Sequence, residues 1–209
     1  MTSKTKRDLD SAGDTAASKA QAAAPVTARP TATPTAILVP GDRYTVDMPQ
    51  LFWAWQALEE LGFAVVKLRW DDPGDEQPDR RVRVAKALDA AEAELGGAPT
   101  LIVGRSSGCL AAELRPDVPF FGYSPVSIPG TPSSLDESLR RTAPSAAVAG
   151  LADPVHDRGR LEAMGFTVME FPGLPHSLMS PAGWRESMAV LRRATALLED
   201  FALPLLRIR

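Results

Sequence analysis

The chain has 209 residues, and 23 Lys and Arg residues nearly balance 26 Asp and Glu residues, which leaves a formal net charge of -3. A weakly acidic chain of this length suits one domain with a single core, and it lacks the positive field that would favour nucleic acid or an anionic membrane. One cysteine forms no intramolecular disulfide, and no run reaches the roughly 18 apolar residues of a membrane span, so we expect a cytoplasmic protein.

The N-terminal segment differs in composition from the rest of the chain. Residues 1–35 are mainly Ala, Thr, Ser, Pro and scattered charges, with almost no large apolar side chain. Such a segment buries too little apolar surface to offset its ordering entropy, so we predict a disordered tail over 1–35 and a folded domain over 36–209. Residues 11–24 lack the apolar centre of a secretory signal, and we interpret the segment as a plain tail rather than a binding or targeting arm.

Strand and helix patterns alternate from residue 36 onward. Short apolar runs that end at Gly or Pro are typical of buried strands, whereas apolar residues spaced three and four apart indicate one face of a helix. Leu51, Trp55 and Leu58 have the helical spacing, and Val84 and Leu88 repeat it. The elements expected in the first half of the domain are strand 36–39, helix 48–61, strand 63–68, loop 70–79, a helix over 84–95 and strand 100–103.

The second half of the domain continues the alternation. The expected elements are helix 109–114, strands 119–123, 145–151 and 166–171, and a final helix whose apolar face holds Trp184, Met188, Leu191, Leu198 and Phe201. The irregular region 124–144 is too short for a large cap domain, although residues 134–141 could form one short covering helix. The pattern predicts the α/β fold class, as a three-layer α/β/α sandwich with a mostly parallel sheet of about six strands and a minimal lid.

A serine lies directly after the third expected strand. Gly104, Ser106 and Gly108 satisfy G-x-S-x-G, the pattern of a tight strand-to-helix turn that exposes a serine hydroxyl. The motif has the required context, since an apolar run precedes it and a helical pattern follows. Ser106 is therefore the candidate nucleophile.

A serine nucleophile needs a base that takes its proton and a carboxylate that orients the base. Ligands bind at the carboxyl ends of parallel strands, so the residues that follow strands are the candidates. His176 follows the sixth expected strand and is preferred to His156 as the base. Asp153 follows the fifth strand almost directly and is preferred to Asp157 as the acid, although Asp157 stays open.

Three segments in this order carry a resemblance to a known family. The elbow 104–108, the acid turn 151–154 and the histidine loop 173–177 make the chain similar to small, compact serine hydrolases of the α/β-hydrolase superfamily, of the dienelactone-hydrolase-like kind. The resemblance spans about 36–201. It implies cleavage of a small acyl substrate through a Ser106, His176, Asp153 triad and an acyl-enzyme.

The tetrahedral intermediate of such a reaction needs preorganised N–H donors. The N–H of Ser107 is the expected first donor, because it follows the nucleophile. The loop after the first strand begins with Pro40, which has no N–H, so the second donor is expected to be the backbone of Asp42 or of Arg43. A carboxylate beside an oxyanion would oppose catalysis, so the Asp42 side chain is expected to point away or to pair with Arg43.

Several alternatives stay open on the sequence. Arg105, within the elbow, either attracts an anionic substrate or pairs with an acid, and pairing is preferred. Trp70 and Phe121 are interpreted as core rather than pocket residues. No cofactor, metal, nucleic-acid or membrane partner is expected, and the oligomeric state is open. The same triad could also serve non-hydrolytic acyl transfer or cyclisation, or the chain could be a hydrolase-like binding protein without turnover.

Overall fold

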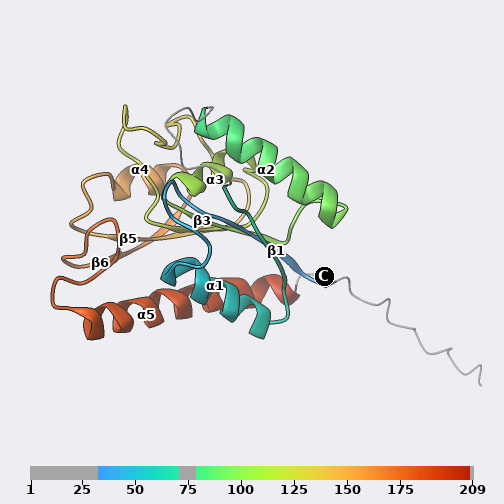
Figure 1. Cartoon of the computed structure of the whole chain (residues 1–209). Coiled ribbons are helices and arrows are strands. Elements are labelled where there is room, and N and C mark those ends of the chain that lie inside the picture. The colour runs from blue at the N-terminus through green and yellow to red at the C-terminus, as the bar shows by residue number, and fades with distance from the viewer. Residues whose placement is uncertain (1–32, 71–78, 208–209) are drawn as a thin grey trace, which may run out of the picture. The chain divides into compact units, whose positions relative to one another are not determined.

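The computed structural model describes residues 33–70 and 79–207 (Figure 1). The predicted tail, 1–35, lies outside the described residues except for its last three positions, and most of the predicted loop 70–79 lies outside them as well. The description below concerns the unit that begins at Ala32.

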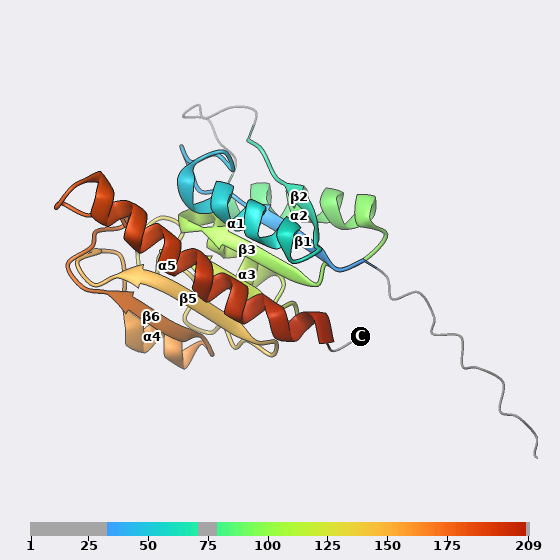
Figure 2. The same ribbon diagram turned by 90° about the horizontal axis from the view of Figure 1, so that it is seen from below.

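The centre of this unit is a six-stranded sheet in which every neighbouring pair of strands is parallel (Figure 2). Its order is β2-β1-β3-β4-β5-β6. The inner strands β1, β3, β4 and β5 are almost wholly buried, which explains why they read as continuous apolar or small-residue runs. The strands are β1 Thr35–Val39, β2 Ala64–Lys67, β3 Leu101–Arg105, β4 Phe120–Tyr123, β5 Ser145–Gly150 and β6 Thr167–Phe171.

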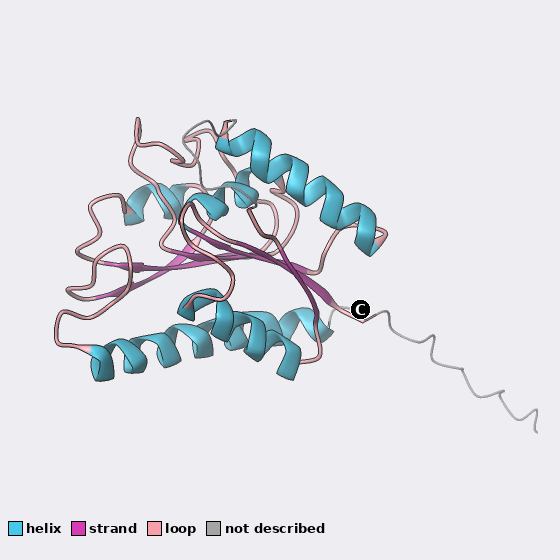
Figure 3. Ribbon diagram, viewed as in Figure 1, coloured by secondary structure: helices cyan, strands magenta, loops and turns pink. Residues whose placement is uncertain are grey.

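Helices cover both faces of the sheet (Figure 3). One core, which includes Leu58 and Leu198, lies between the sheet and the helices α1 and α5, whereas a second, which includes Leu88 and Leu110, lies on the other face. The predicted three-layer α/β/α sandwich is confirmed. The helices are α1 Pro49–Glu60, α2 Arg80–Leu95, α3 Ala111–Leu114, α4 Arg158–Ala163 and α5 Trp184–Ala202, with 3-10 helices η1 Ser106–Leu110 and η2 Leu203–Arg207.

Local chemistry sets the ends of α2. The carboxylate of Asp79 accepts a hydrogen bond from the Arg81 backbone N–H at 2.8 Å, so it caps the first turn. Gly96 ends the helix in the left-handed conformation, with φ 73°. The predicted apolar positions Val84 and Leu88 are buried against the sheet.

Three elements differ from the sequence prediction. The expected helix 109–114 begins as the 3-10 turn η1 at the nucleophile and becomes α-helical only at α3. The expected covering helix over 134–141 is wrong, because this segment contains only turns and irregular backbone. The sequence prediction missed α4, a short helix with one buried residue, Leu161.

The apolar face of α5 only partly contacts the core. Leu198 and Ala202 are fully buried, whereas Trp184 is 65% exposed and Met188 is 47% exposed. The spacing correctly predicted the helix, and the structure adds that its apolar face leaves the core in the first two turns.

Candidate active site

The candidate nucleophile lies where the strand order reverses, between β1 and β3. From β1 the chain continues to β2 on one side, while β3 begins the run of strands on the other side. A crevice forms at the carboxyl ends of such a strand pair. Ser106 directly follows β3, and Asp42 lies in the loop that follows β1.

The elbow is a strained turn that requires its two glycines. Ser106 has φ 52°, a left-handed conformation that non-glycine residues rarely adopt. A Cβ atom on Gly104 would lie 2.7 Å from the Phe120 ring, and one on Gly108 would lie 2.2 Å from the Val39 carbonyl oxygen. The Phe120 ring and the backbone of β1 therefore leave no room for side chains at these positions, as the motif predicted.

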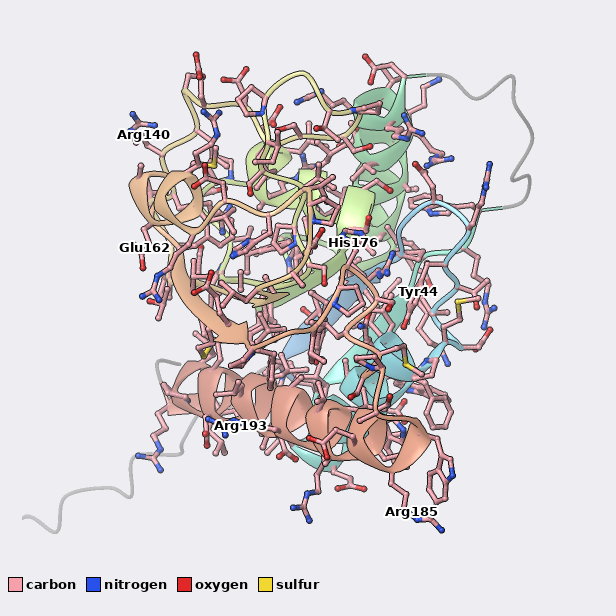
Figure 4. The ribbon with its side chains drawn as sticks, turned by 90° about the vertical axis from the view of Figure 1, so that its left-hand side faces the viewer. Tyr44, Arg140, Glu162, His176, Arg185 and Arg193 are labelled. Carbon is pink, nitrogen blue, oxygen red and sulfur yellow. The ribbon has the colours of Figure 1, made fainter. Side chains whose placement is uncertain are left out.

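The three predicted triad residues lie in one hydrogen-bonded chain. The Nε2 atom of His176 lies 2.8 Å from the Ser106 hydroxyl oxygen, and its Nδ1 atom lies 2.7 Å from Asp153 Oδ2. The Asp153 side chain is fully buried, and its other oxygen accepts a hydrogen bond from the Val155 N–H at 3.0 Å. Figure 4 looks toward the carboxyl ends of the strands, where the loop that carries His176 lies over the sheet. This geometry can carry a proton from the serine to an oriented imidazole.

The two sequence alternatives lie elsewhere. The Asp157 carboxylate accepts from the Arg160 N–H at 3.0 Å and caps α4, so it is committed to a helix end. The buried ring of His156 contacts Glu170 through Nε2 at 2.8 Å. The structure thus brings Asp153, and not Asp157, to His176.

The Asp42 side chain points toward α2 and forms ion pairs with Arg80 and Arg83. The side chain points away from the site and is paired, as expected. The predicted partner, Arg43, was wrong, because two arginines of α2 reach the carboxylate. Burial alone would raise the pKa of Asp42, but hydrogen bonds and charges from Arg80 and Arg83 hold that pKa below its ordinary value.

The predicted oxyanion donors differ in their surroundings. Ser107 lies in the first turn of η1, where backbone N–H groups have no acceptor within the helix. The Asp42 N–H, in contrast, donates to the Ser107 hydroxyl oxygen at 2.8 Å. Because the Asp42 N–H is already hydrogen-bonded, this contact counts against its predicted role as an oxyanion donor. The other predicted donor residue, Arg43, has a left-handed backbone conformation with φ 53°.

Sequence reasoning missed a buried polar network behind the triad. Arg105 is 8% exposed, stacks on the Tyr44 ring at 4.3 Å and donates through Nε to Gln50 Oε1 at 3.3 Å. Gln50 in turn donates through Nε2 to the backbone oxygen of Ser177, next to His176, at 2.8 Å. The network therefore joins the nucleophile turn to the histidine loop. Tyr44 and Gln50 come from the loop after β1 and from α1, and no local motif marks them.

Burial lowers the pKa of Arg105. The preferred prediction, that Arg105 pairs with an acid, is wrong: among the ion pairs of the described residues none involves Arg105, because a neutral glutamine and an aromatic ring surround its guanidinium.

The two aromatic residues interpreted as core have the expected burial. Phe121 is fully buried in the core that contains α1 and α5. Trp70 is partly buried against the opposite core, and its Nε1–H donates to the Pro40 carbonyl at 3.3 Å.

Over residues 33–70 and 79–207, no helix has the length and apolar character needed to cross a membrane. Within the same ranges, no three side chains of the His, Cys, Asp and Glu types gather in a way that could hold a metal ion.

No family model matches the sequence, and no curated protein matches it. Solved structures do resemble the chain. The monoacylglycerol lipase of Paleococcus ferrophilus is 19% identical with a TM-score of 0.59, over 81% of this chain and 96% of that one. An alpha-beta serine hydrolase homologue from Coxiella burnetii is 18% identical with a TM-score of 0.58, over 80% and 84%. Alpha/beta hydrolase domain-containing protein 10 from mouse is 14% identical with a TM-score of 0.61, over 83% and 91%.

Proposed function

We propose that this chain, which has the α/β-hydrolase fold, is a serine hydrolase that cleaves an ester, thioester or lactone of a small substrate. The observation that carries the proposal is the continuous contact from Ser106 through His176 to Asp153, at 2.8 and 2.7 Å. The similar structures include a lipase and a serine hydrolase homologue, which supports the same class of reaction. The dienelactone-hydrolase-like kind stays a prediction.

Acylation is the first half of the proposed reaction. The Ser106 oxygen attacks the acyl carbon while the serine proton passes to His176 Nε2. The attack forms a C–O bond between Ser106 and the acyl group, and the carbonyl oxygen becomes a tetrahedral oxyanion. Collapse of this intermediate breaks the bond to the leaving group, which takes the proton from His176. The acyl group is then an ester of Ser106.

Deacylation reverses the roles. Water attacks the acyl carbon, His176 takes its proton, and the carboxylic acid leaves as the Ser106 oxygen regains a proton. The buried carboxylate of Asp153 holds the imidazole in one tautomer and stabilises the imidazolium in both halves. The Ser107 N–H is the proposed oxyanion donor. A second donor, from Asp42 or Arg43, stays a prediction.

Cys109 is not proposed as a nucleophile. It is 1% exposed, and burial raises the pKa of its thiol, which disfavours the reactive thiolate.

Labelling with a fluorophosphonate tests the proposal without knowledge of the substrate. Intact-mass measurement should find one adduct on the native protein and none on Ser106→Ala. His176→Ala should lose labelling as well, because the serine then has no base. Cooperative thermal unfolding of each variant serves as the folding control. Absence of an adduct on the folded native protein would reject the hydrolase and favour a binding protein.

A further inference from the structure

An apolar cavity, here called the α1/α5 groove, lies between the start of α1, the first turns of α5 and the segment that directly follows His176. Its volume is about 350 Å³, within the range of small-molecule sites. None of the side chains that line it is charged. The residues that matter below are Tyr44, Gln50, Ser177, Met179, Trp184 and Met188.

The inner end of the groove is close to the proposed chemistry. Ser177, in its wall, directly follows His176 in the chain. Tyr44, also in its wall, stacks on Arg105, the residue before Ser106. Figure 4 shows His176 and Tyr44 at the same edge of the sheet, with Arg185 on the first turn of α5. None of the three triad side chains lines the groove, but its wall adjoins the triad at two points, through Ser177 in the chain and through the contact of Tyr44 with Arg105.

The polar groups in the groove wall already have partners. The Tyr44 hydroxyl oxygen accepts from the Gln50 N–H at 3.0 Å, and the Gln50 side chain uses both its oxygen and its nitrogen. The Ser187 hydroxyl donates to the Gly183 carbonyl at 3.0 Å and accepts from the Ser180 N–H at 2.9 Å. Because no wall charge is present and these groups are satisfied, the groove rewards burial of hydrocarbon rather than of polar groups.

The outer part of the groove exposes large apolar side chains. Trp184 is 65% exposed, Met179 is 52% exposed and Met188 is 47% exposed. When exposed apolar residues gather around a concavity, they mark a binding site more often than they mark surface without a function. Methionine side chains adapt to occupants of different shape, which suits a flexible chain better than a rigid ring.

We propose that the α1/α5 groove binds the hydrocarbon chain of the acyl group whose carbonyl carbon lies at Ser106. The inference rests on the proposed function for its chemistry, and it narrows the substrate class to esters or thioesters of aliphatic acids with an extended chain. Three other occupants would compete with this interpretation of the groove: a lipid surface, a second copy of this chain or a protein partner.

The test compares two esters with the same leaving group, 4-nitrophenyl acetate and 4-nitrophenyl decanoate, at concentrations below micelle formation. Met188→Glu places a charge in the groove at a position where the native methionine is 47% exposed. The matched control is Val82→Glu, on α2 at the opposite face of the sheet, where the native valine is 44% exposed. Thermal unfolding checks that both variants fold.

We expect Met188→Glu to lower kcat/KM for the decanoate about tenfold, the loss expected when the burial of about two methylene groups is forfeited. Its kcat/KM for the acetate should stay within about twofold of the native value, because an acetyl group does not reach the groove. Val82→Glu should change neither substrate. An unchanged ratio of decanoate to acetate in Met188→Glu, with both esters hydrolysed, overturns the groove inference and leaves the proposed function standing.

A binding measurement separates failure of the groove from failure of the reaction. Isothermal titration of decanoate into Ser106→Ala should give a Kd that rises about tenfold when Met188→Glu is added and stays constant when Val82→Glu is added. If fluorophosphonate labelling fails but this pattern appears, the groove binds hydrocarbon in a protein without turnover. If decanoate binds with the same Kd to all three proteins, or to none, the groove inference is overturned whatever the activity.

Discussion

Asp153 and Asp157 have opposite environments although both follow β5. The Asp153 carboxylate is fully buried and contacts His176, whereas the Asp157 carboxylate accepts from the backbone of Arg160. A buried carboxylate against an imidazole selects a tautomer, while a capping carboxylate satisfies a backbone donor at a helix start. The two residues should therefore respond differently to the same isosteric change.

Asp153→Asn should lower kcat/KM by about 10⁴-fold, because the amide favours the wrong tautomer of His176. Asp157→Asn should keep activity within about twofold, since asparagine also caps helices well. Ester hydrolysis and thermal unfolding of both variants check this. The assignment of the acid is wrong if Asp157→Asn is the more damaging change to activity.

The Asp42 ion pairs make the free energy of unfolding depend on pH in the acidic range. Arg80 and Arg83 hold the pKa of Asp42 below its ordinary value against the opposing effect of burial. Such a group contributes stability that is fully present above the unfolded-state pKa, near 4, and that is lost as the pH falls through the lowered folded-state pKa.

We expect Asp42→Asn to cost about 1 kcal/mol or less at pH 7, because the carboxylate is partly exposed. The difference in free energy of unfolding between native protein and variant should shrink as the pH falls below about 4. Urea denaturation across this range measures it. The exposed Asp200→Asn serves as control, and a pH-independent difference for Asp42→Asn would contradict the prediction.

At the scale of elements, the elbow couples β1 to β3. Gly108 is in contact with the end of β1, since a Cβ there would lie 2.2 Å from the Val39 oxygen and 2.7 Å from the Pro40 oxygen. The contact holds the loop after β1 against the turn that carries Ser106. The glycine pattern is therefore a packing requirement between two elements as well as a turn requirement.

Gly108→Ala should lower the free energy of unfolding by about 1–3 kcal/mol, because the backbone of Val39 and Pro40 must move to make room for the methyl group. Gly97→Ala is the matched control: its Cβ meets no atom within 4 Å, so a change of at most about 0.5 kcal/mol is expected. Denaturant unfolding compares the two. Equal effects from both substitutions would show that the close approach to β1 does not constrain this turn.

Long periodic elements were predictable and short ones were not. α1, α2 and α5 each repeat apolar residues over several turns, so their existence and approximate bounds followed from spacing. α4 buries one residue, Leu161, and has no periodicity to detect. The segment 134–141 has the composition of a short helix, but Arg81 donates to the Ser134 carbonyl and Glu113 accepts from the Asp136 N–H, so contacts with other elements set its backbone.

At the scale of the whole molecule, the sheet separates two cores. Leu198, on α5, is fully buried in the core on one face, and Ile37, on β1, is fully buried in the core on the other face. Substitutions in cores that share no contacts act independently within one cooperative unit.

Leu198→Ala should cost about 2–5 kcal/mol and Ile37→Val about 0.5–1.5 kcal/mol. The double variant should lose the sum within about 0.5 kcal/mol, as measured by denaturant unfolding. Leu203→Ala, at a position 41% exposed, should cost much less than Leu198→Ala. A coupling above about 1 kcal/mol between Ile37 and Leu198 would mean that the two cores do not respond separately.

Residue spacing alone was enough to predict the six strands, the long helices α1, α2 and α5, the elbow around Ser106 and the chain order Ser106, Asp153, His176. These follow from local spacing and from the rule that parallel strands end at one edge. Which carboxylate meets His176 depended on how the loops after β5 and β6 pack together, because both candidates follow the same strand. The tertiary structure also decided that Arg80 and Arg83 hold Asp42.

The α1/α5 groove could not be predicted from the sequence, for a similar reason. Periodicity marks Trp184 and Met188 as an apolar face of α5 but does not say whether another element covers that face. Contacts between residues far apart in the chain depend on how the helices pack on the sheet, and that packing leaves the first turns of α5 open beside the histidine loop.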